Sequence, residues 1–207
     1  MSTDSIEQLK QKIECWLAEN LDTKRQGHTR RVRETAVHLA KRYGIDPEKA
    51  DLAAMMHDMY RFHGQQERED ALVDRLGLPA RYKGNLKLAH SKVAAAALAA
   101  DWGIHDREIL DAVAYHTTGR AGMCPLEKVV YLADAIEPAR DYPGVDALRQ
   151  LAEEDLDRAC LASLESTLAF VRAGGEAVDQ DTVRARDSLK EEINEHERNV
   201  HAGGAGH

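Results

Sequence analysis

Apolar residues in this sequence recur with the spacing of α-helices, and no segment sustains the alternation of a β-strand. The first apolar stripe comprises Ile6, Leu9, Ile13, Trp16 and Leu17. No fixed-period repeat and no long linker divides the chain. The sequence therefore predicts an all-α helical bundle, with residues 1–195 as a single domain. The small, polar stretch 196–207 is expected to be a disordered tail.

Composition narrows the class of protein. The net charge of −8 argues against a surface that coats nucleic acid. No apolar run approaches the roughly 20 residues of a membrane helix, and the first residues, MSTDSIEQ, lack the regions of a secretory signal. Cys15, Cys124 and Cys160 are widely spaced and odd in number, as in reduced proteins. We expect a cytoplasmic protein with no nucleic-acid or membrane partner.

The stretch 50–61, ADLAAMMHDMYR, places ionisable side chains inside this bundle. A helix through it carries an alanine-rich stripe that continues into His57, Asp58 and Arg61. An imidazole and a carboxylate in an apolar interior would cost several kcal/mol unless they are paired or shift their pKa values. A metal ion removes that cost, because it takes both groups as ligands.

Other predicted helices carry similar residues on their apolar stripes. Together with His57 and Asp58, these are His28, His90, His116 and Asp134. Any one of them is more simply explained as a hydrogen-bonded core residue, but their joint occurrence favours a metal site. Mixed imidazole and carboxylate ligands suit iron, manganese, cobalt or zinc better than calcium or magnesium. The remaining histidines are assigned to solvent; they are His38, His63, His105, His196, His201 and His207.

Five segments carry a resemblance to a known family. In order they read GHTRRV, AAMMHDMYR, LAHSKVAAAAL, AVAYHTTG and VVYLADAIEPAR. They resemble the HD-domain metal-dependent phosphohydrolases, and among these the YqeK family of symmetrical bis(5'-nucleosyl)-tetraphosphatases. That family cleaves diadenosine tetraphosphate into two ADP. The resemblance covers roughly Ile6 to Lys190 and implies an HD-domain helical bundle with phosphoanhydride hydrolase activity.

The resemblance also implies a ligand set. Its metal, of the iron type, would be held by His28, His57, Asp58 and Asp134. The residues His90 and His116 would either ligate a second metal or face the phosphates directly. Two positions depart from the family: Ser91 follows His90 where glycine is usual, and Arg61 replaces a lysine.

The implied reaction is hydrolysis by a metal-activated water, which Asp58 would orient or deprotonate. Arginines near the ligands would offset phosphate charge; these are Arg25, Arg31, Arg61 and Arg140. For Arg31 a solvated surface position is an equal alternative. The Thr117 hydroxyl and the Gly119 backbone N–H would donate to phosphate oxygens. The loop Ala177–Thr182 is a candidate nucleoside contact, although loop packing explains it more simply.

Other functions stay open at this point. One alternative is an HD phosphohydrolase of another nucleotide, such as a monophosphate or a guanosine polyphosphate. Less favoured alternatives are an HD-type di-iron oxygenase and a nucleotide-binding regulator without turnover. The expected partner is a small nucleotide, and a homodimer stays open as well.

Overall fold

The computed structural model describes residues 3–62 and 64–203, and within these ranges it contains helices and no strand. In chain order the elements are α1 (Thr3–Asn20), α2 (Thr23–Arg42), α3 (Pro47–Met56), α4 (Gln66–Arg75), the 3-10 turn η1 (Ala80–Tyr82), α5 (Leu86–Asp101), α6 (Arg107–Tyr115), α7 (Pro125–Ile136), α8 (Val145–Glu154), α9 (Leu156–Ala173) and α10 (Gln180–Gly203). The predicted all-α class is confirmed. The organisation as one domain stays a prediction.

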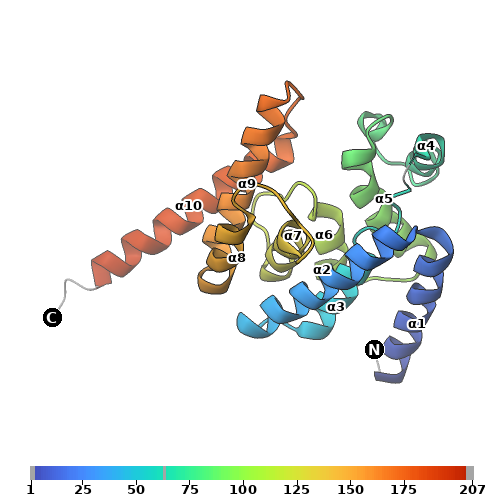
Figure 1. Cartoon of the computed structure of the whole chain (residues 1–207), viewed down its shortest axis with the longest axis horizontal. Coiled ribbons are helices and arrows are strands. Elements are labelled where there is room, and N and C mark those ends of the chain that lie inside the picture. The colour runs from blue at the N-terminus through green and yellow to red at the C-terminus, as the bar shows by residue number, and fades with distance from the viewer. Residues whose placement is uncertain (1–2, 63, 204–207) are drawn as a thin grey trace.

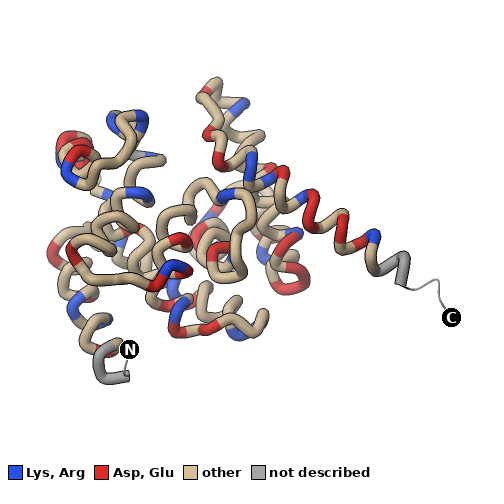
Figure 2. The backbone as a smooth tube through the Cα atoms, turned by 180° about the vertical axis from the view of Figure 1, so that it is seen from behind, with Lys and Arg blue, Asp and Glu red and all other residues tan. Residues whose placement is uncertain are grey.

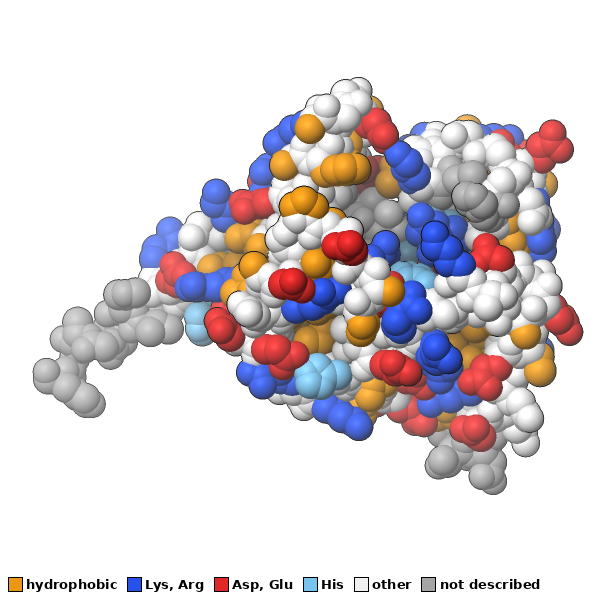
Figure 3. Space-filling model, in the orientation of Figure 1, with side chains coloured by type: hydrophobic (Ala, Val, Ile, Leu, Met, Phe, Trp, Pro, Cys, Tyr) orange, Lys and Arg blue, Asp and Glu red, His pale blue; other side chains and the backbone are white. Residues whose placement is uncertain are grey.

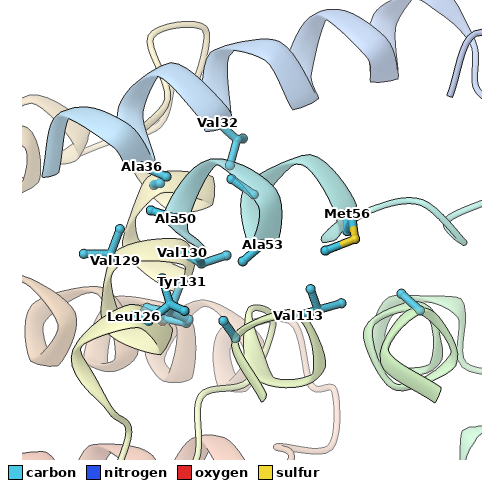
Figure 4. Close-up of a cluster of buried hydrophobic side chains, with 14 of the residues drawn as sticks. Val32, Ala36, Ala50, Ala53, Met56, Val113, Leu126, Val129, Val130 and Tyr131 are labelled. Atoms are coloured by element: carbon cyan, nitrogen blue, oxygen red, sulfur yellow. The ribbon is translucent and has the colours of Figure 1, made fainter. Parts of the chain in front are cut away.

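Helices α2, α3, α6 and α7 pack around one apolar core (Figure 4). Val32 of α2 and Ala53 of α3 are both fully buried at this contact. Small side chains such as Ala53 let these two helices approach closely. Val113 of α6 and Val130 of α7 close the core from the other side. This packing fixes the helices that carry the candidate ligands.

The remaining helices flank this centre. Helices α8, α9 and α10 lie on one side of α6 and α7, and α1, α4 and α5 lie on the other (Figure 1). Where the chain is described, none of its helices has both the length and the hydropathy needed to cross a lipid bilayer.

Helix α10 differs from its sequence-based prediction. The disordered tail was expected from residue 196, but α10 continues to Gly203, and residues 204–207 lie outside the described residues. No glycine or proline interrupts the chain between Val183 and Ala202, so the helix propagates through residues that favour it. Figure 2 shows α10 leaving the body of the molecule with acidic and basic residues along its length.

Helix starts follow the capping residues. Asp22 accepts a hydrogen bond from the Arg25 backbone N–H at 2.8 Å and caps α2. Helix α2 begins at Thr23, so Gly27 lies inside it. Asp155 caps α9 in the same way. The preceding helix α8 had no sequence-based prediction.

Candidate metal centre

His57 and Asp58 lie just after the end of α3 instead of inside it. The helix ends at Met56, and the Arg61 N–H then donates to the Asp58 carbonyl at 3.0 Å in a tight turn. Neighbouring side chains on an α-helix diverge by about 100°, since there are 3.6 residues per turn. His57 itself keeps helical backbone angles, φ −55° and ψ −42°. Both side chains lie in the interior, where they are 0% and 1% exposed, because helices pack around this end of α3 from more than one side.

One oxygen of Asp58 faces a first group of ligand-type residues. Its Oδ2 lies 3.7 Å from His28 Nε2 and 3.5 Å from His57 Nε2. The Oδ1 atom of Asp134, on α7, lies 3.0 Å from the same His28 nitrogen. The structure therefore brings together the four residues of the predicted ligand set, from α2, the end of α3 and α7.

The other oxygen of Asp58 faces a second group. Its Oδ1 lies 3.3 Å from His90 Nε2 and 3.7 Å from His116 Nε2. The two imidazole nitrogens are 3.1 Å apart. The Thr117 hydroxyl lies 3.3 Å from His90 Nε2 and 3.2 Å from His116 Nε2. Asp58 thus stands between two sets of histidine nitrogens.

Backbone carbonyls set the tautomers of two of these histidines. His57 Nδ1 lies 2.6 Å from the Ala54 carbonyl, and His116 Nδ1 lies 2.8 Å from the Val113 carbonyl. A carbonyl only accepts, so Nδ1 carries the proton in both rings and the Nε2 lone pair faces the site. Burial lowers the pKa of His57 to about 3, which keeps its ring neutral.

This donor set fits a divalent transition metal. Among the described residues, the buried His57 Nε2 has no hydrogen-bond partner, nor has the buried Asp58 Oδ1. Buried polar atoms without partners are rare because they forfeit their hydration. A cation between the histidines and Asp58 would satisfy both atoms. Nitrogen and oxygen donors lie within 4.8 Å of one another in three combinations: His28, His57 and Asp58; His57, His116 and Asp134; and Asp58, His90 and His116.

Three arginines border the ligand carboxylates. Arg25 Nη1 donates to Asp58 Oδ2 at 2.6 Å, and Arg61 Nη1 lies 3.6 Å from Asp58 Oδ1. Arg140 donates to the Asp134 carboxylate and, through Nε, to its carbonyl at 2.7 Å. Burial alone would raise the pKa of Asp134, but the Arg140 guanidinium lowers it, so this carboxylate is ionised. Figure 3 shows Lys and Arg side chains around a hollow in which a histidine is visible.

Comparisons with known proteins identify the family. The HD domain matches residues 25–139. The chain is 43% identical to a symmetrical bis(5'-nucleosyl)-tetraphosphatase of Bacillus subtilis, over 75% of this chain and 83% of that protein. It is 37% identical to one of Halalkalibacterium halodurans, over 82% of this chain and 91% of that protein. The chain belongs to the HD-domain symmetrical bis(5'-nucleosyl)-tetraphosphatase family.

A solved structure agrees with this membership. The crystal structure of an HD superfamily hydrolase from Clostridium acetobutylicum matches this chain with a TM-score of 0.82 and 38% identity. The match covers 88% of this chain and 97% of that one. The HD-domain helical bundle predicted from the sequence is confirmed.

The structure places two of the predicted phosphate or nucleoside contacts of this HD-domain chain differently from their predictions. The Gly119 N–H donates to the Tyr115 carbonyl at 2.7 Å, so it is not open to a phosphate. Gly119 has a φ of 64°, and an added Cβ would lie 2.9 Å from the Ala185 Cβ of α10. Close packing of α10 therefore accounts for this glycine. The loop 177–182 does not line the cavity that opens at the metal centre.

Glu137 is a site residue that the sequence reading missed. It follows α7 directly, is 3% exposed, and accepts from Arg31 Nε at 2.6 Å. Its Oε1 lies 3.1 Å from His28 Nδ1, so the His28 proton sits on Nδ1 and the lone pair of Nε2 faces the site. Arg31 is therefore paired with Glu137. Its sequence signal lay in the segment VVYLADAIEPAR, where Glu137 precedes a proline at the end of the helix.

Replacing Glu137 with alanine should weaken the centre without removing a ligand. We expect metal affinity or kcat/KM to fall about 10- to 100-fold, because the His28 ring loses the partner that orients it. The measurement is metal titration of the purified variant together with steady-state kinetics. Glu153→Ala is the matched control, since Glu153 contacts His38 at 2.8 Å on the surface. An unchanged affinity and rate in Glu137→Ala would remove this role.

A second buried glutamate holds the turn beside Arg61. Glu69 on α4 is fully buried, and its Oε1 accepts from the Phe62 N–H at 3.1 Å. Burial raises the pKa of Glu69 to about 7, from an ordinary value of 4.5. The native state therefore keeps a proton that the unfolded chain loses at lower pH. The stability from this protonation is complete below about pH 4.5 and is lost as the pH rises through 7.

Glu69→Gln should flatten this pH dependence. Between about pH 5.5 and 8.5, we expect the fall in unfolding free energy to shrink by about 2 kcal/mol, because the amide does not ionise. Urea denaturation at the two pH values measures it. Glu67→Gln, an exposed change on the same helix, is the control. The assignment fails if wild type and Glu69→Gln lose the same stability over this range.

Proposed function

We propose that this chain hydrolyses dinucleoside tetraphosphates symmetrically, converting diadenosine tetraphosphate and water into two ADP. One observation carries the proposal: Asp58 stands between two sets of histidine nitrogens, and its neighbour His116 lines a cavity together with Arg61 and Arg140. The activity named for the Bacillus subtilis and Halalkalibacterium halodurans relatives supports it. Hydrolysis of a phosphoanhydride needs both an activated water and cationic groups for the phosphates.

The proposed cofactor is a divalent metal held by His28, His57, Asp58 and Asp134. Iron is the first choice, and manganese, cobalt and zinc are alternatives with the same donor preference. A second metal would take the other Asp58 oxygen with His90 and His116, which otherwise face the phosphates. Bound there, the metal supplies an activated water and polarises a phosphoryl oxygen.

The side chains of this chain then have separate tasks. Asp58 orients the attacking water and receives its proton. Arg61, on the cavity wall, stabilises the charge that moves to the bridging oxygen when its bond to phosphorus breaks. Arg25 and Arg140 offset charge on the remaining phosphates, and the Thr117 hydroxyl donates to a phosphate oxygen. This local cationic rim is needed because the chain as a whole carries a net charge of −8.

The test is a product analysis of the metal-loaded protein with a nucleotide panel. Two ADP from diadenosine tetraphosphate, without AMP and ATP, would support the proposal. Turnover confined to a monophosphate or a guanosine polyphosphate would favour another HD phosphohydrolase. Oxygen uptake would favour an oxygenase, and nucleotide binding without product would favour a regulator. The cytoplasmic location and the homodimer stay predictions from the sequence.

A further inference from the structure

The cavity at the metal centre has a charged end and an apolar end. Its volume is about 810 Å³, and Arg61, Asp134 and Arg140 lie at the charged end. Most of the rest of its wall comes from α9 and from the segment after α7; these residues are Tyr142, Pro143, Ser163, Ser166, Thr167, Ala169, Phe170 and Ala173. A ligand that fills it must therefore carry negative charge at one end and apolar surface at the other.

Phe170 is the exposed aromatic residue on this wall. It is 79% exposed and is the one large hydrophobic side chain in that state among the described residues. The opposite face of α9 is an ordinary core face, on which Leu164 and Leu168 are buried. The neighbours of Phe170 on the cavity wall, Ala169 and Ala173, are small, so they leave the Phe170 ring uncovered. An exposed phenyl ring that lines a cavity is available to a ligand.

The α9 wall changes character along its length. Ser163, Thr167 and Phe170 follow one another at helical spacings of four and three, so they share one face. The Ser163 hydroxyl donates to the Tyr131 hydroxyl at 3.3 Å. Across the cavity the Tyr142 hydroxyl donates to the Ala135 carbonyl at 2.9 Å, which fixes that wall. Along this face, the hydroxyl groups of Ser163 and Thr167 come before the Phe170 ring. In a nucleotide, the hydroxyl-bearing ribose likewise comes before the base.

We propose that Phe170 is a stacking platform for one nucleobase of the substrate, and that the cavity seats one nucleoside with its phosphates toward Arg140. This inference rests on the proposed function and specifies the occupant of its cavity. Aromatic side chains bind bases through their π-faces, and every nucleobase has such a face. The continuity of the aromatic wall with the arginine end selects a nucleotide over a purely apolar ligand. Figure 3 shows hydrophobic side chains on the projecting end of α9 beside the hollow bordered by Lys and Arg.

Binding of ADP and of inorganic pyrophosphate to the metal-loaded full chain separates base from phosphate recognition. Calorimetry on Phe170→Ala should show ADP affinity reduced about 5- to 100-fold and pyrophosphate affinity unchanged. Phe170→Tyr keeps the ring and should bind ADP as wild type does. Val171→Ala, next to it on α9 and absent from the cavity wall, is the matched control.

Three outcomes would overturn the inference: ADP affinity unchanged in Phe170→Ala, equal losses for ADP and pyrophosphate, or a changed oligomeric state with ADP binding intact. The last would mean that a second copy of the chain covers this ring. Turnover of diadenosine tetraphosphate by wild type is measured separately. If wild type forms no ADP, the proposed function fails, whereas the two binding experiments still decide the role of Phe170. In an active enzyme, Phe170→Ala should raise KM and leave kcat within about twofold.

Discussion

Asp58→Asn should abolish hydrolysis, with a fall in kcat of well over about 100-fold. Loss of a partner that merely orients a ligand costs up to about 100-fold, and Asp58 is itself placed between two sets of histidines at 3.3–3.7 Å. The amide removes the negative charge and leaves one oxygen to serve both groups. Rates are measured by chromatographic separation of ADP, and bound metal by elemental analysis after gel filtration.

Asp101→Asn is the control for this change. Asp101 is also paired with an arginine, at 2.7 Å from Arg75 Nη2, but on an exposed surface. This variant should keep both the metal and the rate, and thermal melts should show that both variants fold. A metal content and kcat equal to wild type in Asp58→Asn would refute the assignment of Asp58 to the centre.

Removal of the metal by a chelator should eliminate hydrolysis and lower the melting temperature. A ligand present at a hundred times its Kd stabilises the native state by about 2.7 kcal/mol. For a chain of this size, that corresponds to a fall in Tm of about 5–10 °C. Circular dichroism melts before chelation, after it, and after addition of iron, manganese, cobalt or zinc measure the effect and rank the metals.

Two histidine variants show where the metal acts. His57 is fully buried and its Nε2 faces the site, so the Tm of His57→Ala should no longer respond to metal. His38 is exposed and paired with Glu153, so His38→Ala should respond as wild type does. If metal raises the Tm of His57→Ala as much as that of wild type, the metal binds elsewhere.

The ligand set was readable from the sequence because helical phase is a local property. Once the apolar stripe of a helix is known, residues at its spacing point to the same interior. His28, His90 and Asp134 were identified in this way, although they lie far apart in the chain. The exposed position of His38 follows from the same reasoning, whereas His105 was assigned to solvent as a loop residue and is also exposed. The family resemblance added the order of these residues along the chain and the chemistry that they imply.

Only the tertiary structure decided the roles of residues at or beyond the ends of helices. Helix α3 ends at Met56, and His57 and Asp58 are both buried in the turn that follows because helices from distant parts of the chain surround it. Glu137 meets His28 across 109 residues of sequence, and Gly119 is needed for the approach of α10. Such contacts depend on where distant helices stop and how they pack. Local periodicity gives the face on which a residue lies, but not the atom that it meets there.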